Sequence, residues 1–197
     1  MLSIVNNSED LIILIHEIYG VNPFIVDTAN RLALYGYDVV CPDLCGLDYP
    51  FDYSEQEAAY RYFYDNIGFD KGTDIVINIA KQLESSYKRI FLLGFSVGAT
   101  TAWLSSESEL FSGIICCYGS KIRDYNYICP SCSALLLFPS HEKSFNVKDF
   151  VSSFKKPGVT VHLLEGNHGF IDCYSTEYNE DSAKRAFDLI KGFIKIK

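Results

Sequence analysis

The pentapeptide Gly94-Phe95-Ser96-Val97-Gly98 constrains the fold of this chain more than any other stretch. An apolar run, Ile90 to Leu93, precedes it and indicates a buried strand, while Ala99 to Leu104 behind it indicates the start of a helix. A strand, G-x-S-x-G and a helix in succession predict a nucleophile elbow, the turn that raises a serine hydroxyl above a sheet. Glycine at both flanks avoids collision between strand and helix, and the helix N-terminus favours a developing oxyanion. The alternative is a chance turn made of common loop residues.

Length and composition favour one globular domain, residues 1–197, because a chain of 197 residues that is 48% hydrophobic can bury a sizeable core. The net charge of −8 and the lack of a Lys/Arg block argue against nucleic acid and anionic membranes as partners. The N-terminus has neither the basic region nor the apolar run of a signal peptide. Every apolar run is of strand length, so no membrane span is expected. We therefore expect a cytoplasmic protein.

Seven cysteines, an odd number, favour free thiols in a reducing compartment over a disulfide framework. Cys116 and Cys117 are adjacent inside an apolar run. Cys129-Pro130-Ser131-Cys132 is a CxxC motif, but it lacks the second pair or nearby histidines of a zinc site and the helix of a redox site. No metal is expected.

Strands alternate with helices along the chain, which predicts an α/β fold with a mostly parallel central sheet and helices on both faces. Ile75, Ile79 and Leu83 recur at four-residue intervals and are expected to form one buried helix face. The loops 43–53, 119–131 and 171–180 are expected to shape a pocket. The predicted strands are Leu11–Ile15, Asp38–Cys41, Ile90–Leu93, Gly113–Tyr118, Ala134–Phe138 and Thr160–Leu164, and the predicted helices are Pro23–Gly36, Ser54–Asn66, Asp70–Ser85, one from Ala99, Val147–Phe154 and Ser182–Ile194.

Three chemically suited side chains follow predicted strands in the order Ser96, Glu142, His168. A serine needs a base to take its proton and a carboxylate to orient that base, and this fold supplies them in the order Ser, Asp/Glu, His. His168 lies in a turn between two glycines, and the alternative is an ordinary loop histidine. Glu142 is the expected acid, with an exposed charge as its alternative and Asp124 as its competitor. Asp172 is too near His168 in sequence to reach its ring comfortably.

Two other histidines are expected to lie outside the catalytic group. His162 lies inside a predicted strand, where a core position is expected, and His141 is expected at the surface.

The oxyanion hole needs two N–H donors. The backbone of Val97 follows the nucleophile directly, and Ile18 in the loop after the first long strand is the best second candidate. Glu17 beside it either lies close to the nucleophile or is a solvated loop glutamate.

Three segments together resemble the dienelactone hydrolase family of α/β-hydrolases: His16-Glu17-Ile18-Tyr19-Gly20-Val21-Asn22-Pro23, Gly94-Phe95-Ser96-Val97-Gly98-Ala99 and Asn167-His168-Gly169-Phe170. The similarity runs from about Leu11 to the C-terminal helix, and its most specific part is H-E-x-x-G-x-N-P. The resemblance implies a catalytic triad and hydrolysis of lactones or esters. It also implies that Glu17 lies near the nucleophile and that the Ile18 backbone belongs to the oxyanion hole.

The chain departs from the family pattern in three ways. Ser96 stands where the dienelactone enzymes use cysteine, Glu142 stands at the usual aspartate position, and the N-terminal hairpin is reduced. Arg61 and Arg123 are candidates for the arginines with which the family binds a substrate carboxylate, or they are surface charges.

We therefore expect a serine hydrolase that cleaves a small-molecule ester, thioester or lactone through an acyl-enzyme, without metal or organic cofactor. A monomer is expected, with a dimer as the alternative. One rival function is a hydrolase-fold protein that binds a small ligand without turnover. Another is an interaction module based on Tyr60-Arg61-Tyr62-Phe63-Tyr64, whose aromatic residues are otherwise expected to form a helix face or line the pocket mouth.

Overall fold

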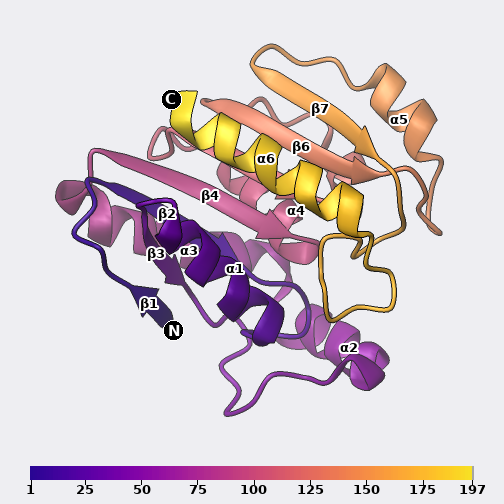
Figure 1. The fold of residues 1–197 in the computed structure, drawn as a ribbon, viewed down its shortest axis with the longest axis horizontal. Helices are drawn as coiled ribbons and strands as arrows, with labels where there is room; N and C mark the ends of the chain where they lie inside the picture. The colour runs from indigo at the N-terminus through magenta and orange to yellow at the C-terminus, as the bar shows by residue number, and fades with distance from the viewer. Residues whose placement is uncertain (197) are drawn as a thin grey trace.

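The computed structural model describes residues 1–196, and within them seven strands form one sheet in the order β1-β3-β2-β4-β5-β6-β7 (Figure 1). The strands are β1 Leu2–Ile4, β2 Asp10–Ile15, β3 Asp38–Cys41, β4 Arg89–Phe95, β5 Gly113–Cys117, β6 Ser133–Pro139 and β7 Val159–Leu164. The α-helices are α1 Pro23–Leu34, α2 Gln56–Asn66, α3 Gly68–Leu83, α4 Val97–Ser105, α5 Val147–Ser153 and α6 Glu180–Ile196. Short 3-10 helices are η1 Tyr53–Glu55, η2 Glu84–Ser86 and η3 Ser120–Tyr125.

The strands from β2 to β7 run parallel to their neighbours, which confirms the predicted mostly parallel α/β-hydrolase sheet. β1 pairs antiparallel with β3, with Leu2 opposite Cys41 and Ile4 opposite Val39. Residues Leu2–Ile4 therefore form one antiparallel strand at the edge of the sheet.

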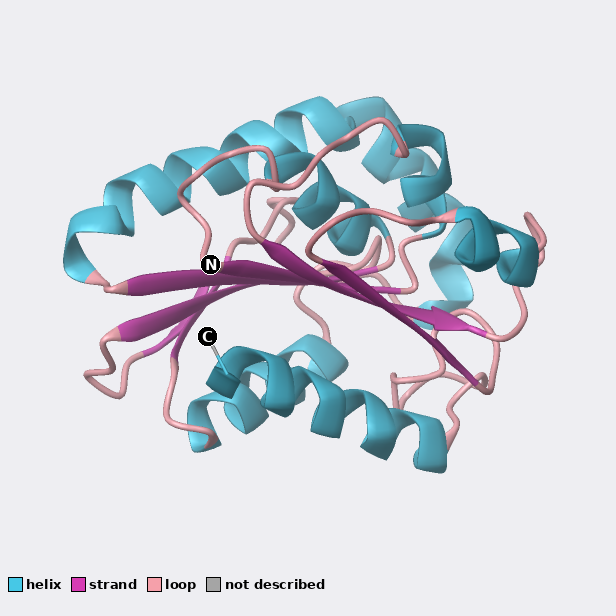
Figure 2. Ribbon diagram, turned by 90° about the horizontal axis from the view of Figure 1, so that it is seen from above, coloured by secondary structure: helices cyan, strands magenta, loops and turns pink. Residues whose placement is uncertain are grey.

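Helices cover both faces of the sheet (Figure 2). Alternate residues of β2 point to opposite faces, so Ile13 belongs to one core and Ile12 to the other, and both are completely buried. The core that contains Ile13 is closed by α2, α3, α4 and α5, and the core that contains Ile12 is closed by α1 and α6. The parallel arrangement brings the carboxyl ends of β2, β4, β6 and β7 to one edge.

Helix α3 buries a different face from the predicted one. Its buried residues are Phe69, Gly72, Val76 and Ala80, whereas Ile75, Ile79 and Leu83 are only partly buried beside them. A Cβ on Gly72 would lie 3.5 Å from the Thr101 hydroxyl oxygen of α4. At Gly72, α3 thus approaches α4 so closely that a single added carbon would already be in van der Waals contact with Thr101.

The expected core position of His162 is wrong. The side chain is half-exposed on β7, because β7 is the edge strand of the sheet. Within the aromatic run of α2, Phe63 is buried while Tyr60 is exposed, and none of these residues lines the main cavity described below.

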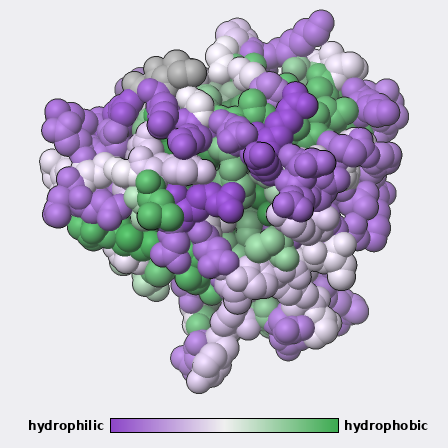
Figure 3. All heavy atoms as spheres, viewed as in Figure 1, coloured by the Kyte–Doolittle hydropathy of each residue, from purple (hydrophilic) through white to green (hydrophobic). Residues whose placement is uncertain are grey.

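The face seen in Figure 3 is covered mostly by hydrophilic side chains, with hydrophobic ones showing between them. Large hydrophobic side chains that are exposed, such as Leu34, Tyr49 and Tyr127, belong to separate segments of the chain. Among the described residues, no helix is both long enough and apolar enough to cross a bilayer.

Candidate active site

Ser96 occupies a strained turn between β4 and α4, with φ 54° and ψ −114°. Left-handed φ values are costly for residues with a side chain and cluster at functional sites. The flanking glycines are required sterically. A Cβ on Gly94 would lie 2.1 Å from the Gly98 carbonyl oxygen, and a Cβ on Gly98 would lie 2.4 Å from the Ile15 carbonyl oxygen. These contacts are the collisions expected of a nucleophile elbow.

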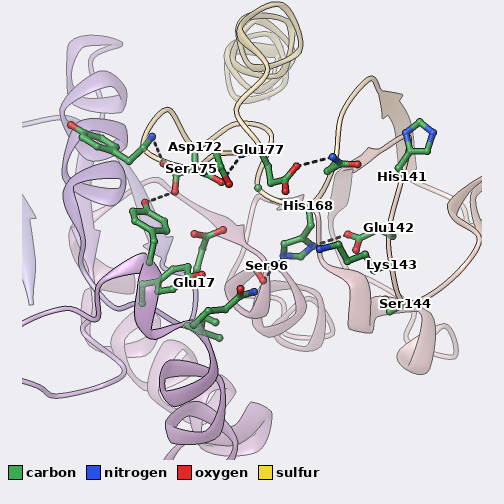
Figure 4. A pocket seen from close by; sticks show the side chains of 18 of the residues that line it. Glu17, Ser96, His141, Glu142, Lys143, Ser144, His168, Asp172, Ser175 and Glu177 are labelled. Carbon is green, nitrogen blue, oxygen red and sulfur yellow. Dashed lines mark hydrogen bonds and ion pairs between the residues drawn. The ribbon is translucent and has the colours of Figure 1, made fainter.

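Ser96, His168 and Glu142 form one hydrogen-bonded chain (Figure 4). The Ser96 Oγ lies 2.9 Å from His168 Nε2, and His168 Nδ1 lies 2.7 Å from Glu142 Oε1. The three residues follow β4, β7 and β6, so strand-end loops bring together side chains that are far apart in sequence. Asp124 is not part of this chain, because its carboxylate pairs with Lys121 and Arg123 in the η3 region.

The surroundings of His168 favour its protonated form. Burial alone would lower its pKa, but the hydrogen bond to Glu142, the charge of Glu142 and the charge of Glu17 together raise it. The Glu142 side chain is only 5% exposed, which rules out a solvated surface charge. The Tyr118 ring packs edge-on against the imidazole, with ring centroids 5.0 Å apart, and supports the ring from the β5 side.

Glu17 is not a solvated loop residue, since it is 5% exposed and lines the same cavity as Ser96. Burial, followed by the charge of Asp172, raises its pKa to about 7, against opposing effects of His168 and the Tyr118 hydroxyl. Figure 4 shows Glu17 on the other side of Ser96 from Glu142. Glu17 therefore shares the cavity with Ser96 and His168, and its pKa lies well above that of an ordinary glutamate.

His16 fixes the loop that carries Glu17 and Ile18. The ring is completely buried, its Nδ1 lies 2.5 Å from the Glu17 carbonyl oxygen, and its Nε2 accepts a hydrogen bond of 2.9 Å from the Leu44 N–H. This pattern requires the neutral ring with its proton on Nδ1, and burial lowers the pKa of His16 accordingly. The Glu17 carbonyl and the Ile18 N–H belong to the same peptide group, so His16 holds the plane of that group.

The described part of the chain contains one group of side chains close enough to share a metal ion, His16, Asp43 and Cys45. Both ring nitrogens of His16 already have hydrogen-bond partners, so the ring offers no free lone pair to a metal. The Cys129 side chain of the CxxC motif is exposed, and this motif does not enter the main cavity.

Ser96 opens into a cavity of about 660 Å³. The walls come from the loops after β2, β6 and β7 and from the start of η1. Loops 43–53 and 171–180 contribute as expected, through Tyr53, Asp172 and residues 174 to 177, but loop 119–131 contributes nothing. The lining side chains include Glu17, Ile18, Tyr19, Tyr53, Ser54, Gln56, Ser96, His141, Glu142, Lys143, Ser144, Asn167, His168, Asp172, Tyr174, Ser175, Thr176 and Glu177.

The contact between Tyr53 and Asp172 is a feature that sequence reasoning missed. The Tyr53 hydroxyl donates to Asp172, across 119 positions of sequence, and the Tyr174 hydroxyl donates to Asp27 at 2.7 Å. These bonds tie the 171–180 segment to η1 and α1 and close one side of the cavity. No local pattern in the sequence marks such a pair.

Comparison with known proteins gives one family and several similar chains. The model of the dienelactone hydrolase family matches residues 2–196. Protein YczH of Bacillus subtilis is 35% identical over 184 residues, which cover 92% of this chain and 90% of that protein. The carboxymethylenebutenolidase of Pseudomonas putida is 29% identical over 195 residues, covering 89% of this chain and 81% of the enzyme.

A solved structure shares the fold at lower identity. The dienelactone hydrolase-like promiscuous phosphotriesterase P91, from metagenomic libraries, superposes with a TM-score of 0.74 at 14% identity, covering 95% of this chain and 86% of that one.

Proposed function

Since this chain belongs to the dienelactone hydrolase family and is a hydrolase of ester bonds, we propose that it cleaves small carboxylic esters, thioesters or lactones through an acyl-enzyme on Ser96. The observation that carries the proposal is the continuous chain of hydrogen bonds from Ser96 through His168 to Glu142 at the wall of a cavity. A serine hydroxyl becomes an effective nucleophile when such a base accepts its proton.

In the proposed acylation step, His168 Nε2 takes the proton of Ser96 while Oγ attacks the substrate carbonyl carbon. The Glu142 carboxylate accepts a hydrogen bond from His168 Nδ1–H, which orients the ring and stabilises the imidazolium that forms. His168 then gives its proton to the departing alcohol or thiol, which leaves the acyl group on Ser96. For a lactone, the leaving oxygen remains attached to the acyl chain.

Two backbone N–H groups are proposed to donate hydrogen bonds to the negatively charged oxygen of the tetrahedral intermediate. Val97 is the first residue of α4, so its N–H has no acceptor within the helix. Ile18 lines the cavity beside Glu17, and its N–H belongs to the peptide group that His16 holds. Donors fixed before the reaction stabilise the oxyanion without reorganisation.

Water completes the proposed cycle by the reverse sequence. His168 removes a proton from water as the water oxygen attacks the acyl carbon, and returns it to Ser96 Oγ as the acid leaves. The whole cycle uses side chains of this chain, backbone N–H groups and water.

The proposal is tested with p-nitrophenyl esters from acetate to octanoate, assayed on the wild type, Ser96→Ala and the control Ser152→Ala on the exposed face of α5. Loss of Ser96 should reduce kcat by about 10⁶-fold, while the control keeps wild-type turnover. A serine-directed phosphonate should label Ser96, as read by peptide mass spectrometry. Turnover that survives in Ser96→Ala overturns the nucleophile assignment. Absence of both turnover and labelling favours the rival function, ligand binding without chemistry.

A further inference from the structure

The cavity around Ser96 has an uneven distribution of charge. Outside the Ser96–His168–Glu142 chain, its lining contains three carboxylates, Glu17, Asp172 and Glu177. The lining also includes Lys143 and the exposed imidazole of His141, which Figure 4 shows on the Glu142 side of His168, away from Glu17. A substrate group on the Glu17 side of Ser96 therefore faces acidic residues.

In the part of the chain that the structure describes, the two buried acidic side chains of this set have no lysine or arginine partner. Glu17 and Asp172 are 5% and 1% exposed, and within residues 1–196 neither forms an ion pair with a lysine or arginine. Asp172 accepts its hydrogen bonds from the Tyr53 hydroxyl and the Tyr174 N–H, which are uncharged donors. The partly exposed Glu177 accepts a hydrogen bond of 2.7 Å from the Asn167 side-chain amide, another uncharged donor. Burial raises the pKa of both Glu17 and Asp172, so their negative charge grows as the pH rises. That charge acts on whatever enters the cavity, because water screens these two buried groups only weakly.

The arginines considered for binding a substrate carboxylate lie elsewhere. Arg61 is an exposed residue of α2 that pairs with Glu57. Arg123 pairs with Asp124 and lies over the ring of Phe145, with its guanidinium carbon 4.8 Å from the ring centroid. Within the described chain, no arginine lines the cavity.

We propose that this site selects its ester by charge: it accepts neutral and cationic substrates and rejects those that carry a carboxylate. The inference rests on the proposed function, since it concerns the substrate of the same site. Tyr19 and Tyr53, whose ring centroids are 4.8 Å apart, line the wall next to Glu17. Aromatic faces beside carboxylates suit an apolar or cationic group and offer nothing to an anion.

The test uses three phenyl acetates with the same acyl group and a para substituent of different charge: carboxylate, carboxamide or trimethylammonium. Each kcat/KM is divided by the rate constant for alkaline hydrolysis of the same ester, which corrects for leaving-group reactivity. The carboxamide should exceed the carboxylate by about tenfold or more, with the difference mainly in KM, and the trimethylammonium ester should equal or exceed the carboxamide. Added salt should reduce the preference.

Two variants and one control assign the effect to the cavity. Glu177→Gln and Asp172→Asn should each lower the ratio of carboxamide to carboxylate by a few-fold. Glu109→Gln removes an equal charge from the exposed turn between α4 and β5, outside the cavity lining, and should leave the ratio unchanged. Equal hydrolysis of carboxylate and carboxamide by the wild type, or an unchanged ratio in both cavity variants, overturns the proposal.

A binding experiment separates failure of this inference from failure of the proposed chemistry. The matching acetanilides, 4-acetamidobenzoate and 4-acetamidobenzamide, resist hydrolysis and can be titrated into Ser96→Ala by calorimetry. Tighter binding of the amide supports charge selection even if the ester assays overturn the acyl-enzyme. Equal or tighter binding of the benzoate contradicts charge selection while leaving the nucleophile assignment intact.

Discussion

Glu142 Oε1 lies 2.7 Å from His168 Nδ1, and the charge of this buried carboxylate helps to raise the pKa of the imidazole. The base must be neutral to accept the Ser96 proton, so kcat/KM should increase as the pH rises through a value above 6.5. Replacing Glu142 by Gln should lower kcat by about 10²- to 10⁴-fold and move that pH midpoint downward. The measurement is the pH–rate profile of wild type and variant. Asp124→Asn is the control, and a midpoint that moves there instead would reassign the acid.

The close approach of Gly98 to β2 gives a test of the elbow. In Gly98→Ala the new methyl group would lie 2.4 Å from the Ile15 carbonyl oxygen and 2.5 Å from that of His16, both backbone atoms, so folding or activity should be lost. Gly192→Ala is the matched control, because nothing lies within 4 Å of a Cβ there. That change should raise the free energy of unfolding by up to about 1 kcal/mol through helix propensity. Urea unfolding and ester hydrolysis report both results, and an active, stable Gly98→Ala protein would contradict the elbow geometry.

Burial of Glu17 predicts a dependence of stability on pH. Its pKa in the folded protein is about 7, above the ordinary 4.5, so between these values the folded state binds more protons at this group than the unfolded state. The stability that Glu17 contributes is thus fully present below pH 4.5 and is lost as the pH rises through 7, at a cost of up to about 3 kcal/mol.

Replacing Glu17 by Gln removes this titration. The variant should gain stability relative to the wild type as the pH increases from 5 to 8, which urea unfolding at the two pH values measures. A constant difference between the two proteins across this range would mean that Glu17 is ionised throughout. Glu109→Gln, which changes an exposed carboxyl between α4 and β5, provides the baseline.

The hydrogen bonds of His16 predict an effect on the proposed oxyanion hole. His16→Leu removes the contact to the Glu17 carbonyl and frees the Ile18 peptide group to rotate, so kcat should fall by about 10²- to 10³-fold with little change in KM. His16→Gln keeps one donor and one acceptor on a planar group and should restore much of the rate. Chemical denaturation of both variants separates this effect from general instability. Equal kcat values for the two variants would show that His16 is structural only.

The strands and the grouping of Ser96, His168 and Glu142 were accessible from sequence because both depend on local signals. A run such as Leu11 to Ile15 is apolar on both faces, and this alone specifies a strand buried between two helical layers. Ser96, Glu142 and His168 follow directly from the ends of such strands, so predicting the strands also placed the three side chains at one edge.

The features that sequence reasoning missed depend on contacts between distant segments. The buried face of α3 is centred on Gly72 and Ala80 because α4 approaches closely, whereas isoleucine spacing alone favoured a neighbouring face. His162 is half-exposed because β7 is the last strand of the sheet, which strand patterning does not reveal. The bond from Tyr53 to Asp172 likewise joins two loops whose proximity only the finished fold determines.

The adjacent thiols of β5 point to opposite faces of the sheet, so Cys116 lies in the core closed by α2 to α5 and Cys117 in the core closed by α1 and α6. Both are free and at most 1% exposed, and burial raises the pKa of each thiol well above its ordinary value. A thiol reagent can therefore reach either one only when its own layer of helices opens. In variants that retain only Cys116 or only Cys117, the rate of thiol modification would report how often the corresponding layer of helices opens. Two residues that are adjacent in sequence would thus report separately on the two faces of the sheet.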